Sequence, residues 1–201
     1  MKPVVSSLLF IRHAQTALAG TFCGRTDPRL DATGLAQLPS LLERVRAQPS
    51  GGALDAIYTS DLQRAQETAG FLASPANMTV ISRPALREID FGDWEALTWN
   101  EIEERDRTYA NRWITEFPDL PAPNGETISH FKHRVLTEIA FLRIAANGRH
   151  IAVVTHAGVL RVLLEELGHF SPHHAWERTR DYTGTIRCTQ QTSAGALELH
   201  P

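Results

Sequence analysis

The sequence predicts an α/β fold: a three-layer α/β/α sandwich whose central sheet is mostly parallel and ends in a C-terminal antiparallel hairpin. Short apolar runs of strand length alternate with longer segments in which apolar residues recur every three or four positions. Two of the runs, residues 8–11 and 151–155, are continuously apolar, as is typical of parallel strands buried on both faces. Residues 183–199 alternate between polar and apolar side chains, which favours a hairpin.

The first unit contains a predicted strand at residues 4–11, a loop at 21–30 and then a helix. Thr33 is the expected N-cap of that helix, because a threonine hydroxyl can accept a first-turn amide. Pro39 lies inside the helical pattern and should kink the helix or delay its start, since proline has no amide hydrogen. Residues 49–52 end the unit. The apolar positions of this helix are Leu35, Leu38, Leu41, Leu42 and Val45.

The second unit begins with a predicted strand at residues 54–59. Ser60 or Asp61 should cap the helix that follows, and this helix carries Arg64 near its start. A short strand at 79–81 and an irregular stretch at 86–94 come next.

The remaining segments complete a single domain, residues 1–201, with a helical excursion at about 95–146. Residues 98–117 form a charged helix, 119–125 a proline-rich loop and 126–146 a helix closed by Asn147 and Gly148. The strand at 151–155 leads into a helix at 158–167, and the hairpin follows at 183–199.

Composition narrows the class of function. The net charge is −3 without a basic block, which argues against nucleic acid and for a small or protein-sized ligand. The two cysteines, Cys23 and Cys188, lie far apart, so we expect a reducing cytoplasm. No apolar run approaches the roughly 20 residues of a membrane helix, so no membrane partner is expected. Monomer and homodimer both stay open.

Polar residues stand where strands or loops give way to helices. Arg12 and His13 end the first strand, and His156 ends the strand at 151–155. Ligands of open α/β sheets bind at the carboxyl ends of strands, and helix N-termini attract anions. Arginine matches phosphate geometry, and a neutral imidazole is a nucleophile. Together with Arg64 and a protonated His156, this arrangement predicts phosphoryl transfer at His13. We expect no cofactor and no metal ion to take part. The positive charges around His13 should lower its pKa.

Six segments carry a resemblance to a known family, the histidine phosphatase superfamily, also called phosphoglycerate-mutase-like. It covers nearly the whole chain, and its segments are 9–16 (LFIRHAQT), 24–27 (GRTD), 60–65 (SDLQRA), 86–95 (LREIDFGDWE), 124–126 (NGE) and 154–158 (VTHAG).

The resemblance implies a metal-independent phosphomonoester hydrolase. His13 would become phosphohistidine, Arg12, Arg64 and His156 would bind the phosphate, and Glu88 would act first as acid and then as base. Positions where family members contact phosphate or substrate would be Gln15, Thr16, Cys23, Gly24, Asn124, Gly125, Glu126 and Ala157.

Several alternatives stay open. Glu88 has acidic neighbours, so a solvated acidic loop is the competing interpretation there, and Glu126 could cap its helix instead of contacting substrate. His169, His173 and His174 have a zinc-like spacing, although without further ligands a polar surface loop is the better interpretation.

Three residues depart from the family pattern: Ala14, Gln15 and Ala19. Residues 22–27 resemble the α-ribazole phosphatase branch, which suggests α-ribazole 5′-phosphate as substrate. A phosphoglycerate mutase is the first rival, although mutases usually carry a longer insertion between the acid and the second histidine. A catalytically inactive relative that binds phospho-ligands or proteins is the second.

Overall fold

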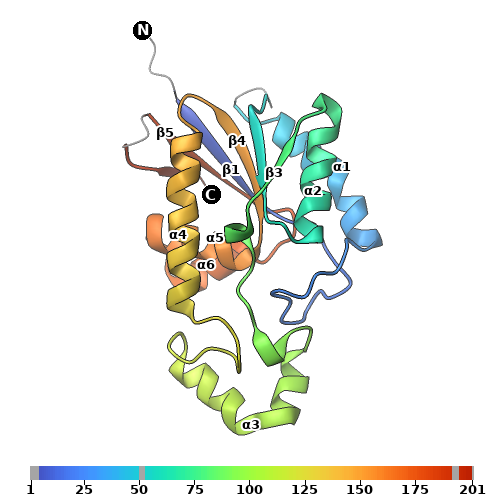
Figure 1. The fold of residues 1–201 in the computed structure, drawn as a ribbon, viewed down its shortest axis with the longest axis vertical. Coiled ribbons are helices and arrows are strands. Elements are labelled where there is room, and N and C mark those ends of the chain that lie inside the picture. Colours follow the sequence, from blue (N-terminus) through green and yellow to red (C-terminus); the bar gives the residue numbers. More distant parts are fainter. Residues whose placement is uncertain (1–4, 50–52, 192–194, 201) are drawn as a thin grey trace.

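The computed structural model describes residues 5–49, 53–191 and 195–200. Within these ranges, six strands form one sheet in the order β3-β2-β4-β1-β5-β6 (Figure 1). The first four are parallel, β5 is antiparallel to β1, and β6 is antiparallel to β5. This confirms the predicted sheet and its hairpin. The strands are β1 (Ser6–Arg12), β2 (Ala56–Thr59), β3 (Val80–Ser82), β4 (His150–Thr155), β5 (Thr185–Gln190) and β6 (Glu198–His200). The predicted start of β1 at Val4 lies outside the described residues.

Helices cover both faces of the sheet, which confirms the three layers. Alternate residues of β1 point to opposite faces. Leu9 and Ile11 pack with α1 (Ala32–Arg46) and α2 (Gln63–Ala73). Leu8 and Phe10 pack in a second cluster with α4 (Ile128–Ala145), α5 (Ala157–Val162) and α6 (Pro172–Thr179). A π-helical turn, Leu163–Leu167, continues α5. The interpretation of the chain as one domain stays a prediction.

The start of α1 differs from the prediction. Asp31 is its N-cap, and its Oδ1 accepts the Gly34 amide at 2.7 Å, whereas Thr33 lies inside the first turn. An aspartate two residues earlier therefore caps the helix in place of Thr33. Pro39 does not delay the start of the helix, which continues past it to Arg46, and its ring is exposed, so it meets no neighbour in the core.

The cap of α2 also differs from the prediction. The helix begins after Leu62, and neither predicted side chain caps it. Asp61 is held by Arg87 instead, through two hydrogen bonds. The first-turn amide of Gln63 donates to Asp27 Oδ1 at 2.6 Å, from a loop 36 residues earlier. A long-range carboxylate has replaced the local cap, and this ties the loop at residues 21–30 to α2.

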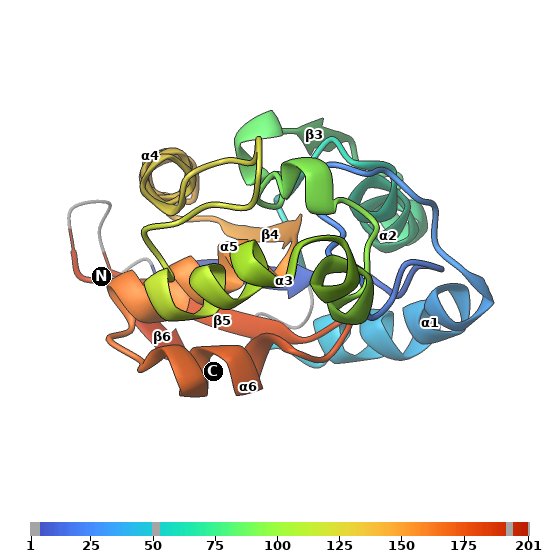
Figure 2. The same ribbon diagram turned by 90° about the horizontal axis from the view of Figure 1, so that it is seen from below.

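The excursion, α3 (Trp99–Glu116), has a small core of its own. Thr98 and Glu101 form a capping box at its start, and Asp106 interrupts its helical backbone. Seen from below, α3 lies across the carboxyl ends of the strands (Figure 2). Its cluster comprises Trp94, Leu97, Ile102, Ala110 and Ala122, with Phe22, Phe91, Trp99, Tyr109 and Trp113 packed around them.

The structure adds one helix that the sequence analysis did not predict. Residues predicted as a polar loop form α6, capped by Ser171, whose hydroxyl accepts the His174 amide at 3.4 Å. None of the helices in the described ranges is both long and apolar enough to cross a membrane.

Candidate active site

The two histidines meet because their strands are neighbours. Arg12 of β1 pairs with Thr155 of β4, and the His13 amide donates to the Thr155 carbonyl at 2.9 Å. His13 and His156 therefore leave adjacent parallel strands at the same edge. Their ring centroids are 5.0 Å apart, and 7% and 0% of the two residues is exposed. A single tetrahedral oxyanion can bridge two rings at this separation.

Hydrogen bonds determine which nitrogen of His13 is nucleophilic. Nδ1 lies 2.7 Å from the Ala14 carbonyl oxygen, which can only accept, so Nδ1 carries the hydrogen. Nε2 then holds the lone pair and accepts from Arg64 Nε at 3.3 Å. The structure therefore presents Nε2, with its electron pair, to the arginine that was expected to bind phosphate.

Arg64 is fully buried in the first turn of α2. Its Nη1 donates to the Thr26 carbonyl at 2.7 Å, and its Nη2 donates to the carbonyls of Gly24 at 2.7 Å and Cys23 at 3.4 Å. We call residues 23–26 the carbonyl loop. It fixes the plane of the guanidinium, so the side chain reaches His13 in one orientation.

Arg12 is held from the opposite side by the end of α6. Its Nη1 donates to the Thr179 carbonyl at 3.0 Å and also to the Arg180 carbonyl. Its guanidinium carbon lies 4.0 Å from the centroid of the Tyr182 ring, and that ring is 5.7 Å from the ring of His13. Tyr182 therefore packs against both the arginine and the nucleophile. Tyr182 was not predicted as a site residue, because none of the family segments includes it.

Glu88 approaches from the irregular stretch, beside the start of α5. Only 8% of it is exposed, and its Oε2 accepts the Gly158 amide at 2.9 Å. Thr155 donates its hydroxyl to the Leu86 carbonyl at 2.8 Å, and Arg134 donates to the Glu88 carbonyl at 2.9 Å. These bonds place the carboxyl group next to the segment that begins with His156. Glu88 is thus a buried acid and not part of a solvated loop.

Burial and the positive charges of the pocket lower the pKa of both imidazoles, which favours their neutral forms. Burial, then the Arg64 charge and more weakly that of Arg12, holds the pKa of His13 well below its ordinary value, as the sequence analysis expected. Burial and the Arg64 charge do the same to the pKa of His156. The expectation of a protonated His156 therefore does not hold for the pocket without an anion, because desolvation and Arg64 disfavour a further cation.

The other residues predicted to contact substrate lie on several elements, and two of them, Cys23 and Gly24, belong to the carbonyl loop. Gly24 and Cys23 contribute carbonyls, and burial raises the pKa of the Cys23 thiol, which favours its protonated form. Ala157 is the first residue of α5. Gln15 donates its side-chain amide to Asp31 at 3.3 Å, at the start of α1. Thr16 is buried, and its backbone forms an isolated bridge with Leu30.

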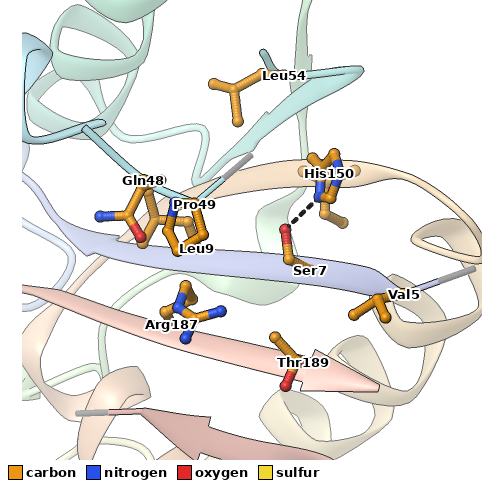
Figure 3. A pocket seen from close by; sticks show the side chains of 10 residues that line it. Val5, Ser7, Leu9, Gln48, Pro49, Leu54, His150, Arg187 and Thr189 are labelled. Carbon is orange, nitrogen blue, oxygen red and sulfur yellow. Dashed lines mark hydrogen bonds between the residues drawn. The ribbon is translucent and has the colours of Figure 1, made fainter. Parts of the chain in front are cut away.

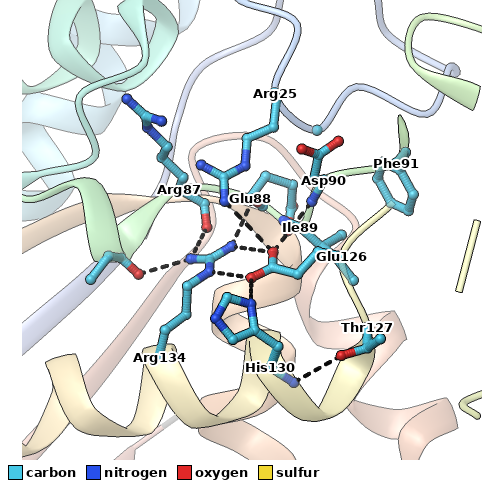
Figure 4. Close-up of polar contacts among 12 residues, drawn as sticks. Arg25, Arg87, Glu88, Ile89, Asp90, Phe91, Glu126, Thr127, His130 and Arg134 are labelled. Atoms are coloured by element: carbon cyan, nitrogen blue, oxygen red, sulfur yellow. Dashed lines mark hydrogen bonds and ion pairs between the residues drawn. The ribbon is translucent and has the colours of Figure 1, made fainter. Parts of the chain in front are cut away.

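Glu126 lies in an ion-pair cluster (Figure 4). Its two oxygens accept from Arg134 at 2.7 and 2.8 Å, and a nitrogen of His130 lies 2.9 Å away. Glu126 does not cap α4, because Thr127 does so by accepting the His130 amide at 3.3 Å. Arg25 approaches the same carboxylate at 3.7 Å.

The rest of that loop is tied to the irregular stretch. Asn124 donates its side-chain amide to Asp93 at 2.9 Å, and the Glu126 amide donates to the Asp90 carbonyl at 2.9 Å. A Cβ on Gly125 would lie 2.7 Å from that carbonyl oxygen, so only glycine fits there without a shift.

A cavity of about 240 Å³ lies at the opposite edge of the sheet, at the amino ends of β1 and β4 (Figure 3). Its polar groups include Ser7, Arg187 and His150, with Ser7 Oγ 2.7 Å from His150 Nδ1. It contains none of the predicted site residues. Among the described residues, no group of three or more histidine, cysteine or carboxylate side chains is arranged to hold a metal ion. His173 pairs with Glu177 on α6.

Comparison with known proteins identifies the class of this protein. The sequence model of the histidine phosphatase superfamily (branch 1) matches residues 8–200, and the chain belongs to that family. It is a phosphoric monoester hydrolase of the histidine phosphatase type, and several of its curated relatives are named as phosphatases.

Particular relatives narrow the comparison. The chain is 32% identical to the adenosylcobalamin/alpha-ribazole phosphatase of Escherichia coli (strain K12) over 162 residues, 80% of this chain and 78% of the relative. It is 29% identical to the metal-independent phosphoserine phosphatase of Arabidopsis thaliana over 197 residues, 96% and 73% of the two chains. The crystal structure of the alpha-ribazole phosphatase from Shigella flexneri superposes with a TM-score of 0.81 at 26% identity, covering 96% of this chain and 94% of that one.

Proposed function

We propose that the protein hydrolyses a small phosphomonoester without a metal ion, through a phosphohistidine at His13. The observation that carries this proposal is the orientation of His13: its Nδ1 is committed to the Ala14 carbonyl, and its Nε2 faces Arg64 beside His156. A neutral nitrogen with a fixed lone pair, buried among cationic groups, is suited to attack a phosphorus atom whose oxygens those groups bind.

In the first step, Nε2 of His13 forms a bond to phosphorus while the ester P–O bond breaks. Glu88 gives its proton to the departing oxygen, so the alcohol leaves neutral and Glu88 becomes a carboxylate. In the second step, Glu88 takes a proton from water, whose oxygen attacks phosphorus as the N–P bond breaks. The products are the alcohol and inorganic phosphate, and Glu88 and His13 regain their starting states.

Charge stabilisation comes from Arg12, Arg64 and His156. Both ring nitrogens of His156 and Nε of Arg12 are buried without a hydrogen-bond partner among the described residues. Buried polar atoms without a partner are rare in native proteins and need an explanation. We infer that the oxygens of a bound phosphoryl group are the partners of these nitrogens. A bound anion raises the pKa of His156, so we expect this ring to take up a proton when substrate binds. The negative charge of the phosphoryl transition state is spread over three oxygens, and Arg12, Arg64 and the protonated His156 would then stabilise it.

For the substrate we propose α-ribazole 5′-phosphate, with phosphoserine as the next candidate. The support is similarity to relatives whose names specify those two substrates. The leaving group would contact residues predicted to bind substrate: Gln15, Thr16, Cys23, Gly24, Asn124, Gly125, Glu126 and Ala157.

The test is phosphate release with chelator present from p-nitrophenyl phosphate, α-ribazole 5′-phosphate, phosphoserine and 3-phosphoglycerate. We expect turnover by the wild type, none by His13→Ala, and unchanged turnover by His174→Ala, an exposed histidine on α6. Isomerisation of phosphoglycerate with negligible release would favour the mutase. Phosphate binding without turnover would favour the inactive relative.

We also propose a cytoplasmic location, as monomer or homodimer. Cys23 and Cys188 are both free, which fits a reducing compartment.

A further inference from the structure

We propose that Glu95 is a positioning residue: it locks the carbonyl loop so that Arg64 meets both His13 and the substrate phosphate in a single orientation. The inference rests on the proposed function, because it concerns how that phosphate pocket is held.

The carboxylate of Glu95 accepts four backbone hydrogen bonds. Oε1 accepts the Arg25 amide at 2.7 Å, and Oε2 accepts those of Thr26 at 2.9 Å and Gly24 at 3.1 Å. The fourth donor is the Phe91 amide, 3.0 Å from Oε1. Three successive amides of the carbonyl loop therefore point at one side chain from a segment 70 residues away. Charge-assisted bonds of this kind are stronger than neutral ones.

The opposite polar groups of the same loop hold Arg64. Carbonyls of Cys23, Gly24 and Thr26 accept from its guanidinium, while amides of the loop donate to Glu95. The peptide units are thus aligned between an anion and a cation, with their amides toward the anion. Each charge stabilises the peptide orientation that the other needs, so the geometry of Arg64 depends on Glu95 without direct contact between them.

The packing around Gly24 leaves little room for another arrangement. A Cβ built there would lie 2.1 Å from the Ile89 carbonyl oxygen and 2.4 Å from Glu95 Oε1. The loop is therefore pressed against the segment that follows Glu88. Because Glu95 also binds the Phe91 amide of that segment, one carboxylate joins the arginine side of the pocket to the acid side.

A glutamine cannot reproduce these bonds. Each carboxylate oxygen accepts two amides, and in Glu95→Gln an NH2 group would face two of those donors, since an amide side chain has only one acceptor oxygen. We expect the carbonyl loop to move and Arg64 to leave its orientation. A displacement of about 1 Å in such a group costs roughly a hundredfold in rate.

The experiment is a double-mutant cycle of Glu95→Gln and Arg64→Lys, measured as kcat/KM for p-nitrophenyl phosphate. Glu101→Gln is the matched control, because Glu101 also accepts a backbone amide, that of Thr98 at 2.8 Å, on an exposed helix start. We expect Glu95→Gln to lose roughly 10- to 100-fold and Glu101→Gln to keep full activity. In the Arg64→Lys background, Glu95→Gln should change kcat/KM by less than about threefold, since residues coupled through one hydrogen-bond network and backbone segment are not additive.

Calorimetric titration with inorganic phosphate gives a second readout that needs no turnover, and Glu95→Gln should weaken that binding at least fivefold. Additive losses in the cycle, or phosphate binding equal to wild type, would overturn the proposal while leaving His13 chemistry intact. A wild type that binds phosphate without turnover would overturn the proposed function instead. Should Glu95→Gln fail to fold, Glu95→Asp, which keeps the charge on a shorter side chain, enters the same cycle with the same criteria.

Discussion

Gly158 leaves room for the carboxyl group of Glu88 because glycine has no side chain. A Cβ there would lie 2.1 Å from Glu88 Oε1, and Phe131 would be 3.1 Å away. Glycine therefore lets the carboxyl group reach the start of α5 and accept the Gly158 amide at 2.9 Å.

Gly158→Ala should displace Glu88 and lower kcat at least tenfold for an alkyl phosphate. The loss should be smaller for p-nitrophenyl phosphate, whose leaving oxygen needs less protonation. Overpacking should also cost about 1–3 kcal/mol of unfolding free energy in urea melts. The control is Gly70→Ala, because nothing lies within 4 Å of a Cβ on that glycine of α2. Equal losses on both substrates would contradict the role of Glu88.

The two buried imidazoles link stability to pH. In the unfolded chain, His13 and His156 take up protons at about pH 6.5. In the folded protein, burial and the Arg64 charge lower both pKa values, so the unfolded state binds more protons below that pH. The contribution of the two residues to the free energy of unfolding is therefore fully present above pH 6.5 and decreases as the pH falls below it.

Urea unfolding at pH 7.5 and 5.5 measures this slope. His156→Asn should show a shallower decrease than wild type, because one of the two groups is gone. Saturating inorganic phosphate should also flatten the wild-type slope, since the anion favours the imidazolium of His156. The same slope in all three samples would contradict the electrostatics described for the pocket.

At the scale of elements, α3 is the least integrated helix. Its buried residues pack in a cluster separate from the two that sandwich the sheet. Native-state hydrogen exchange should therefore show α3 amides opening at a lower free energy than those of β1 and β4. Exchange of α3 only through global unfolding would show instead that the excursion is part of the main core.

Elements with strong periodicity could be predicted from sequence, whereas caps and short helices could not. The predicted strand at 151–155 matched β4, because a short, continuously apolar run is typical of a buried parallel strand. Helix α6 was missed because Pro172–Thr179 is short and rich in polar residues. The amide of Gln63 is bound by Asp27, and long-range partners of this kind have no local signature.

At the scale of the whole molecule, the topology explains why part of the site was predictable. Residues that end adjacent parallel strands must meet, so Arg12, His13 and His156 could be placed together. Arg64 was expected beside them because it stands near the start of a helix that follows a strand, whereas the role of Glu88 could be assigned only through the family resemblance. Tyr182 lies outside the six family segments, and Glu95 ends one of them but was given no role, because contacts made through packing and backbone hydrogen bonds have no sequence signature.

The central claim concerns the covalent state of His13. The direct measurement is mass spectrometry of peptides from enzyme mixed with substrate and chelator and quenched in alkali, where phosphohistidine persists. The account predicts one phosphoryl group on the peptide that contains His13, lost on further incubation with water and absent from His13→Ala. Phosphate on another residue, or rapid hydrolysis with no phosphorylated peptide, would contradict it.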